Sequence, residues 1–272
     1  MLGELRHHPA FASRYVAPRN VDIWLPSGYQ ETPDRSFPVI YMHDGQNLFD
    51  PKTSFLGVDW GIRETLGRLI AEGRARAAMV VGIWNTPRRI QEYLPQRPFE
   101  TSLWAQLRAR LRFIRWTGGG KLLSDNYLKF MVEELKPFIE KEYRTLSNRE
   151  NTFIMGSSMG GLISLYALCE YPHVFGGAGC LSTHWPVVQE VIASYLEKAL
   201  PTAGKHKLYF DYGTRTLDET YEAYQKQVDR MVSAKGYRQG EDWLTRKFEG
   251  AEHGERSWRE RVYIPLEFLL GR

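Results

Sequence analysis

The sequence predicts an α/β fold, in which helices flank both faces of a mostly parallel central sheet. Three observations support this. Short apolar runs of strand length alternate with segments whose apolar residues recur at helical spacing. Several of these runs are apolar throughout, as expected for strands covered on both faces. The length of 272 residues and the hydrophobic content of 43% suit one packed unit, so we expect residues 1–272 to form a single domain.

Seven segments are predicted to be strands, either because polar and apolar residues alternate or because the run is apolar throughout. They are 19–26, 37–42, 77–84, 152–155, 176–181, 207–212 and 243–248. Helical spacing of apolar residues predicts helices over 59–72, 124–139, 162–171, 187–200, 218–234 and 257–270. Strands and helices alternate from residue 37 onward, which is why we expect most strands to run parallel.

Residues 86–123 interrupt this alternation and are predicted to form a basic helical insertion over the sheet. The segment exceeds the usual length of a connection, and its apolar spacing predicts a helix over 103–116. It carries eight basic and two acidic residues, a net +6, so the rest of the chain, whose total is +4, sums to −2. The insertion either covers a pocket for anionic or catechol-bearing substrates or presents a solvated arginine face.

Composition argues against several classes of protein. A net charge of +4 without a recognition motif does not predict nucleic-acid binding. We expect no transmembrane helix and a cytoplasmic location, because no apolar run is long enough to span a membrane and the N-terminus lacks the apolar core of a signal peptide. Cys169 and Cys180 lie in apolar segments and are predicted to be reduced, buried thiols. No Cys/His cluster has zinc-ligand spacing, so no metal is expected.

The segment G-S-S-M-G-G at 156–161 contains the pattern G-x-S-x-G, with Ser158 at its centre. A predicted strand runs directly into it and a predicted helix directly out, which is the context of a nucleophile elbow. Such a turn strains the serine backbone, and Gly156 and Gly160 would let the strand and helix approach closely. Ser158 is therefore the predicted nucleophile; the alternative is a small-residue turn without catalytic function.

A serine hydroxyl is a weak nucleophile without a base, and on such a fold an acid and then a histidine follow the serine after later strands. His253 follows the last predicted strand and precedes the last helix, so it is the predicted base. Asp218 follows strand 207–212 and is the predicted acid. Asp211 and Glu219 are alternatives, and Asp218 itself could instead cap the next helix.

The amides of an oxyanion hole are expected at two places. One is Met159, directly after the nucleophile, and the other is Gly45 or Gln46 in the loop after strand 37–42. The candidate substrate-binding residues also follow strand ends: His184, Trp185 and Asp44. Packing within the core or a loop is the alternative for His184.

Together these motifs resemble the putative-esterase family of α/β-hydrolases, which includes esterase D, feruloyl and acetylxylan esterases, enterobactin-type siderophore esterases and mycolyltransferases. The resemblance runs from about Val21 to the end. It rests on V-I-Y-M-H-D-G-Q-N-L-F (39–49), G-S-S-M-G-G (156–161), Y-G-T (212–214) before Asp218, and G-A-E-H (250–253). The D-G-Q loop at 44–46 is similar to that of siderophore esterases. Several relatives place the acid two residues after the G-T pair, where this chain has Thr216.

The resemblance implies an α/β-hydrolase fold and a serine carboxylic-ester hydrolase that works through an acyl-enzyme without a cofactor. Its substrate would be a small acyl or aryl ester, of the feruloyl, acetyl carbohydrate or siderophore type. Neither nucleic acid nor membrane would be a partner, and the oligomeric state, a homo-oligomer included, stays open. Two alternatives remain, an acyltransferase with the same triad and a catalytically silent α/β-hydrolase that serves as a binding protein.

Overall fold

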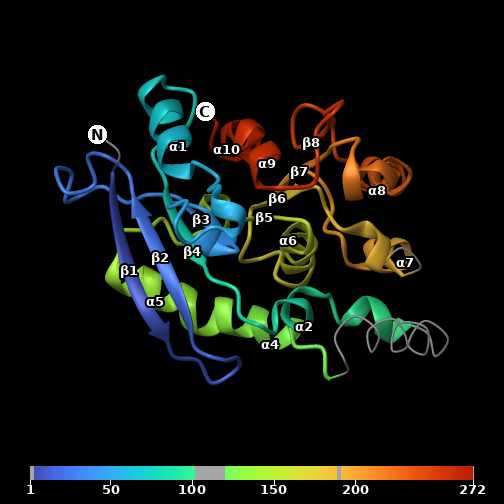
Figure 1. The fold of residues 1–272 in the computed structure, drawn as a ribbon, viewed down its shortest axis with the longest axis horizontal. Helices are drawn as coiled ribbons and strands as arrows, with labels where there is room; N and C mark the ends of the chain where they lie inside the picture. The colour runs from blue at the N-terminus through green and yellow to red at the C-terminus, as the bar shows by residue number, and fades with distance from the viewer. Residues whose placement is uncertain (1–2, 102–119, 189–190, 272) are drawn as a thin grey trace.

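A central sheet organises the computed structural model, which describes residues 3–101, 120–188 and 191–271 (Figure 1). Eight strands in these residues form one sheet in the order β1-β2-β4-β3-β5-β6-β7-β8. They are β1 (Glu4–Phe11), β2 (Arg19–Leu25), β3 (Val39–His43), β4 (Met79–Ile83), β5 (Thr152–Ser157), β6 (Gly177–Leu181), β7 (Lys207–Tyr212) and β8 (Trp243–Lys247). β2 runs antiparallel to both of its neighbours, whereas all strands from β4 to β8 pair in parallel. The predicted α/β fold with a mostly parallel sheet is confirmed.

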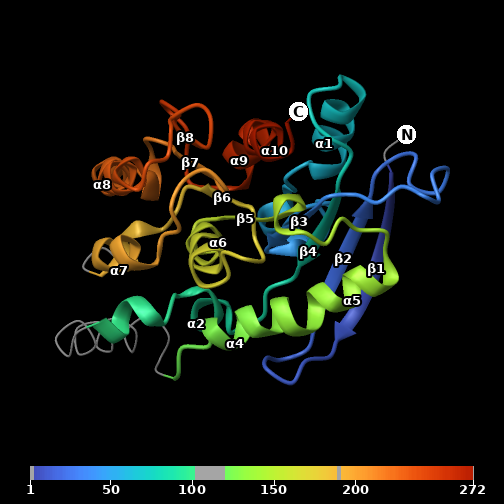
Figure 2. The ribbon, with the colours of Figure 1, turned by 180° about the vertical axis from the view of Figure 1, so that it is seen from behind.

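Helices cover both faces of the sheet (Figures 1 and 2). They are α1 (Ile62–Ala71), α2 (Arg89–Tyr93), α4 (Ser124–Lys129), α5 (Lys136–Glu142), α6 (Met159–Glu170), α7 (Ile192–Ala199), α8 (Tyr221–Ala234), α9 (Glu255–Arg261) and α10 (Tyr263–Leu270). Side chains alternate along a strand, so the inner strands contribute to a core on each face of the sheet. Ile40 packs in the cluster that contains residues of α1, α9 and α10, and Tyr41 in the cluster that contains residues of α4, α5 and α6.

The edge strand β1 was not predicted. Its eight residues are mostly exposed or half-buried and include Pro9, so no apolar period marks them. Polar contacts hold it in place: His7 contacts the Asp22 carboxylate, and His8 Nε2 lies 2.7 Å from the Tyr143 hydroxyl oxygen. These contacts join residues distant in sequence, which is why local patterns miss them.

Two predicted helices differ from the observed ones. The helix over 124–139 is present as α4 and α5, joined without a break by a π-helical turn, Phe130–Leu135. The helix over 257–270 is divided into α9 and α10. Pro265 explains that division, because it has no amide hydrogen to donate to the Arg261 carbonyl one turn earlier. The helix over 187–200 is shorter than expected, with α7 covering only its second half.

The basic insertion is described only at its two ends. Residues 86–101 contain α2 and the turn Arg97–Thr101, and the chain resumes at Gly120. The predicted helix 103–116, with most of the arginines of the insertion, lies outside the described residues. In the part of the chain that the structure describes, no helix is long and apolar enough to cross a membrane. The same residues contain no cluster of three or more His, Cys, Asp or Glu suited to a metal ion.

Candidate active site

Ser158 lies on a sharp turn between β5 and α6, the strand–turn–helix context predicted from the sequence. Its φ is 57° and its ψ is −121°. A positive φ is costly for a residue with a side chain, and such strain is often retained at functional sites. A Cβ on Gly156 would lie 2.8 Å from the Gly160 carbonyl carbon, so a side chain there would clash with backbone. A Cβ on Gly160 would lie 3.4 Å from its nearest neighbours, so of these two glycines only Gly156 shows the predicted close approach.

Ser158, His253 and Asp218 come together beyond the ends of β5, β8 and β7. His253 Nε2 lies 2.9 Å from Ser158 Oγ, and His253 Nδ1 lies 2.6 Å from Asp218 Oδ1. The Asp218 side chain is fully buried and that of His253 is 9% exposed. A proton on Nδ1 is donated to the carboxylate, which leaves Nε2 as an acceptor for the serine hydroxyl. This arrangement can remove the hydroxyl proton of Ser158.

Asp218 accepts two hydrogen bonds besides the one from His253. The Ser182 hydroxyl and the Gly213 amide both donate to Asp218 Oδ2. Ser182 Oγ and the Gly213 nitrogen each lie 2.6 Å from that oxygen. Burial alone would raise the pKa of Asp218, but the hydrogen bonds from His253 and Ser182 lower it below its usual value. The carboxyl group is therefore held in its charged form.

The two alternative acids lie elsewhere. Asp211 forms a buried ion pair with Arg261, with 3.0 Å between Asp211 Oδ1 and Arg261 Nη2. Burial is the main cause that raises its pKa. Glu219 is exposed to solvent. The structure therefore brings Asp218, and neither alternative, to the histidine.

The loops that carry Asp218 and His253 are hydrogen-bonded to each other, which helps to hold the two side chains together. The Thr214 and Arg215 amides donate to the Ala251 carbonyl over 3.0 and 3.1 Å. The His253 amide donates to Thr216 Oγ1 over 2.9 Å. Thr216 itself has a φ of 57° and turns the chain back towards the short helix Thr216–Thr220, which contains Asp218.

The amides expected in an oxyanion hole lie on neighbouring segments. Met159 is the first residue of α6, so its amide has no carbonyl partner within the helix. Gly45 and Gln46 open the short helix Gly45–Asn47 directly after β3. A Cβ on Gly45 would lie 2.5 Å from the carbonyl carbon of Gly82 in β4, so only glycine fits there. The start of α6 and the loop after β3 lie side by side, because a Cβ on Gly160 would lie only 3.4 Å from the Asp44 carboxylate.

A cleft of about 440 Å³ opens over Ser158 and His253. Its wall includes Asp44, Arg89 and Glu255. Arg89 Nε and Nη2 each lie 2.7 Å from an oxygen of the Asp44 carboxylate. Burial is the main cause that raises the pKa of Glu255. The wall of the cleft therefore contains the ion pair of Arg89 with Asp44 and, besides it, the carboxyl group of Glu255.

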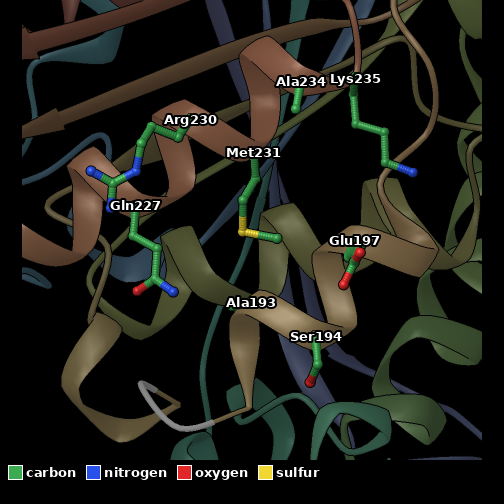
Figure 3. Close-up of a pocket in the computed structure, with 8 residues that line it drawn as sticks. All are labelled: Ala193, Ser194, Glu197, Gln227, Arg230, Met231, Ala234 and Lys235. Carbon is green, nitrogen blue, oxygen red and sulfur yellow. The ribbon is translucent and has the colours of Figure 1, made fainter.

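A second and larger groove, of about 760 Å³, lies between α7 and α8 (Figure 3). The described residues that line it include neither histidine nor aspartate. Ser194 among them donates its hydroxyl to the Val191 carbonyl, 3.1 Å away. The smaller cleft, and not this larger groove, is the one lined by Ser158 and His253.

The predicted substrate-binding residues lie in different places. Asp44 lines the cleft. Trp185 is fully buried, donates its indole N–H to Gln225 Oε1 over 3.0 Å and packs against Phe210, so the structure places it in the core and not in the cleft. His184 is nearly buried, with Nδ1 2.5 Å from the Tyr221 hydroxyl oxygen. Burial lowers the pKa of His184 to about 4, so its ring is neutral near pH 7.

Arg89, Glu255 and Trp258 are among the cleft residues that the sequence did not single out as site residues. Arg89 belongs to the basic insertion, and the excess of charge there was the only signal of it. Glu255 and Trp258 follow His253 closely, but no motif marks them. The Trp258 ring lies edge-on to that of His253, 5.1 Å between centroids.

Comparison with known proteins gives one family. Residues 13–262 match the family described as "Putative esterase". An uncharacterized protein of Bacillus subtilis (strain 168), YbbA, is 26% identical over 280 residues, covering 100% of this chain and 98% of that protein. Ferri-bacillibactin esterase BesA of the same organism is 27% identical over 170 residues, covering 61% of this chain and 55% of BesA.

Solved structures share the fold. A ferulic acid esterase superposes with a TM-score of 0.68 at 17% identity, over 98% of both chains. The enterobactin esterase FES of Shigella flexneri, solved in the presence of enterobactin, superposes with a TM-score of 0.70 at 18% identity, over 98% of this chain and 58% of FES.

Proposed function

Because the chain belongs to the putative esterase family and is a carboxylic ester hydrolase, we propose that it works through an acyl-enzyme formed on Ser158. The observation that carries this proposal is the continuous hydrogen-bonded chain from Ser158 Oγ through His253 to the buried Asp218 carboxylate. A catalytically silent relative would have no need to keep a strained serine in contact with a histidine.

The proposed reaction has two halves. His253 Nε2 takes the Ser158 proton while Oγ attacks the ester carbonyl, and Asp218 stabilises the imidazolium that forms. The Met159 amide and the amide of Gly45 or Gln46 donate to the oxyanion. Collapse of the intermediate breaks the ester bond, and the alcohol leaves with the proton from His253. Water then attacks the acyl-enzyme, with His253 again acting as the base, and releases the acid and free Ser158.

Small acyl or aryl esters are the proposed substrates. Their class is suggested by the names of the solved relatives, for ferulic acid and enterobactin, and the cleft of about 440 Å³ over Ser158 is of a size that takes a small ester. An acyl-enzyme can also be resolved by an alcohol, so an acyltransferase uses the same residues.

Hydrolysis of p-nitrophenyl acetate by three proteins tests the proposal. We expect wild type to be active and Ser158→Ala to lose about three orders of magnitude or more in kcat. Asp218→Asn should lose a comparable factor, because an amide cannot hold the imidazole in the required tautomer. Wild type without activity and without labelling by a fluorophosphonate would overturn the proposal. Ester formation with an added alcohol in place of hydrolysis would identify an acyltransferase.

A further inference from the structure

The Asp44 carboxylate is held by the protein itself. Asp44 is 4% exposed. Arg89 forms a bidentate pair with its carboxylate, with 2.7 Å between each of two guanidinium nitrogens and a carboxylate oxygen. Asn85 Nδ2 donates a third hydrogen bond to Asp44 Oδ1, also over 2.7 Å. Burial alone would raise the pKa of Asp44, but Arg89 and Asn85 lower it. The carboxylate is therefore charged and already satisfied by donors of this chain.

The backbone around Asp44 is held by the same segment of the chain. Asp44 has a φ of 56°, an unfavourable conformation for a residue with a side chain. Its amide donates to the Tyr93 hydroxyl oxygen over 3.3 Å, and the Asn85 amide donates to Gln46 Oε1 over 3.2 Å. Residues 85–93 thus hold both neighbours of Gly45, one on each side.

Arg89 is poorly placed to bind a substrate anion. Two of its nitrogens are committed to Asp44, and its guanidinium carbon lies 5.0 Å from the centre of the Tyr93 ring. Its side chain is only 28% exposed. Its charge is balanced by a carboxylate at contact distance, so an incoming anion would have to compete with Asp44.

We propose that Arg89 is a positioning residue that acts through Asp44 to fix the Gly45 and Gln46 amides where the oxyanion forms. Such amides stabilise the transition state only if they are aimed before the reaction begins. The start of the basic insertion would then hold residues 44–46, the oxyanion loop of this proposal, in place. The inference rests on the proposed function, because it assigns a role within that reaction.

The test compares Arg89→Gln, Asp44→Asn and the double variant with wild type on two esters, neutral p-nitrophenyl acetate and anionic mono-p-nitrophenyl glutarate. We expect kcat to fall about 10- to 100-fold on both esters while KM stays within about threefold. The affinity for an alkyl trifluoromethyl ketone, whose adduct carries an oxyanion, should fall by the same factor as kcat/KM. The double variant should be no worse than the poorer single variant, because both remove one contact.

Arg97→Gln is the matched control. It removes an arginine of the same insertion whose guanidinium pairs with Glu170, 2.8 Å away, and not with Asp44. We expect unchanged kinetics. If Arg89→Gln does not fold, Arg89→Lys keeps the charge without the bidentate pair and should show a smaller fall in kcat.

Three outcomes separate the alternatives. A rise in KM confined to the anionic ester would show that Arg89 contacts substrate and would overturn the inference. Unchanged kcat in Arg89→Gln would also overturn it, while leaving the proposed function intact. An inactive, unlabelled wild type would remove the proposed function itself, and the inference with it.

Discussion

At the scale of single residues, Ser182 links the proposed acid to a buried ion pair. Its hydroxyl donates a hydrogen bond to Asp218. The same oxygen accepts hydrogen bonds from Trp258 Nε1, 3.1 Å away, and from Arg261 Nη2, 2.7 Å away. A hydroxyl has one donor and two acceptor positions, so all of its capacity is used. Arg261 also pairs with Asp211. The orientation of Asp218 is thereby tied to charges buried beneath it, which a sequence pattern around Asp218 does not reveal.

Buried histidines should make the protein sensitive to mild acid. Burial lowers the pKa of His43 to about 3 and that of His184 to about 4. For His43, the neighbouring Asp44 carboxylate raises the pKa, whereas Arg89 and Arg19 lower it further. In the unfolded chain both pKa values return to about 6.5. Between pH 6.5 and 4 the unfolded state therefore binds more protons, and the free energy of unfolding falls as the pH falls, by about 1.4 kcal/mol per unit for each histidine.

Urea unfolding at pH 8, 7, 6 and 5 measures this slope. Below pH 6.5, the free energy of unfolding of His43→Asn should fall less steeply with falling pH than that of wild type, because the variant takes up about one proton fewer on unfolding. Above pH 7, plots of the free energy of unfolding against pH should run parallel for the two proteins. Parallel curves throughout would show that His43 does not titrate on unfolding.

At the scale of elements, strands whose residues are buried were predicted more accurately than exposed ones. Runs that are buried on both faces, such as β4 and β5, were found within a residue or two of their ends. β1 was missed because it is held by His7 and His8 contacts to distant residues instead of by an apolar period. Helix ends were less certain because turns such as Thr216–Thr220 precede α8.

Two glycines in different elements should respond to alanine in opposite ways. A Cβ on Gly45 would meet the backbone of Gly82 at 2.5 Å, so Gly45→Ala must move the oxyanion loop, and we expect kcat to fall at least about tenfold. Gly67 lies inside α1, and a Cβ there would meet no heavy atom within 4 Å beyond the backbone of its own helix and its chain neighbours, so Gly67→Ala should stabilise the protein by about 0.5–1 kcal/mol and leave kcat unchanged. Urea unfolding and p-nitrophenyl acetate kinetics measure both, and equal kcat values in the two variants would refute the steric account of Gly45.

At the scale of the whole molecule, the order of the sheet determines what could be foreseen. Parallel strands place their following loops at one edge, so a serine, an acid and a histidine after successive strands can be expected to meet there. The family resemblance predicted from the motifs is confirmed. The contact between Arg89 and Asp44 could not be foreseen, because 45 residues separate the two and no periodicity links them. Trp185 was predicted near substrate from its place after β6, but its ring turns into the core against Phe210.

The two cysteines should report unfolding of the whole molecule. Both are free and buried, and burial raises the pKa of both thiols. Cys180 is fully buried in β6, between β5 and β7, and pairs in register with Gly156 beneath the elbow. A reagent therefore reaches it only when the centre of the sheet opens.

We expect no fast reaction of the native protein with a disulfide reagent such as DTNB at pH 8, and two thiols per chain in guanidinium chloride. With urea, the rate of labelling of Cys180 should rise in step with the unfolded fraction, because the labelled state and the globally unfolded state are the same. Cys169, 7% exposed at the end of α6, provides the internal comparison through the Cys169→Ala variant. One fast thiol that this variant removes would indicate local fraying of α6. A fast thiol that persists in it would instead mean that β6 opens without global unfolding, and that the sheet beneath Ser158 is less rigid than its burial implies.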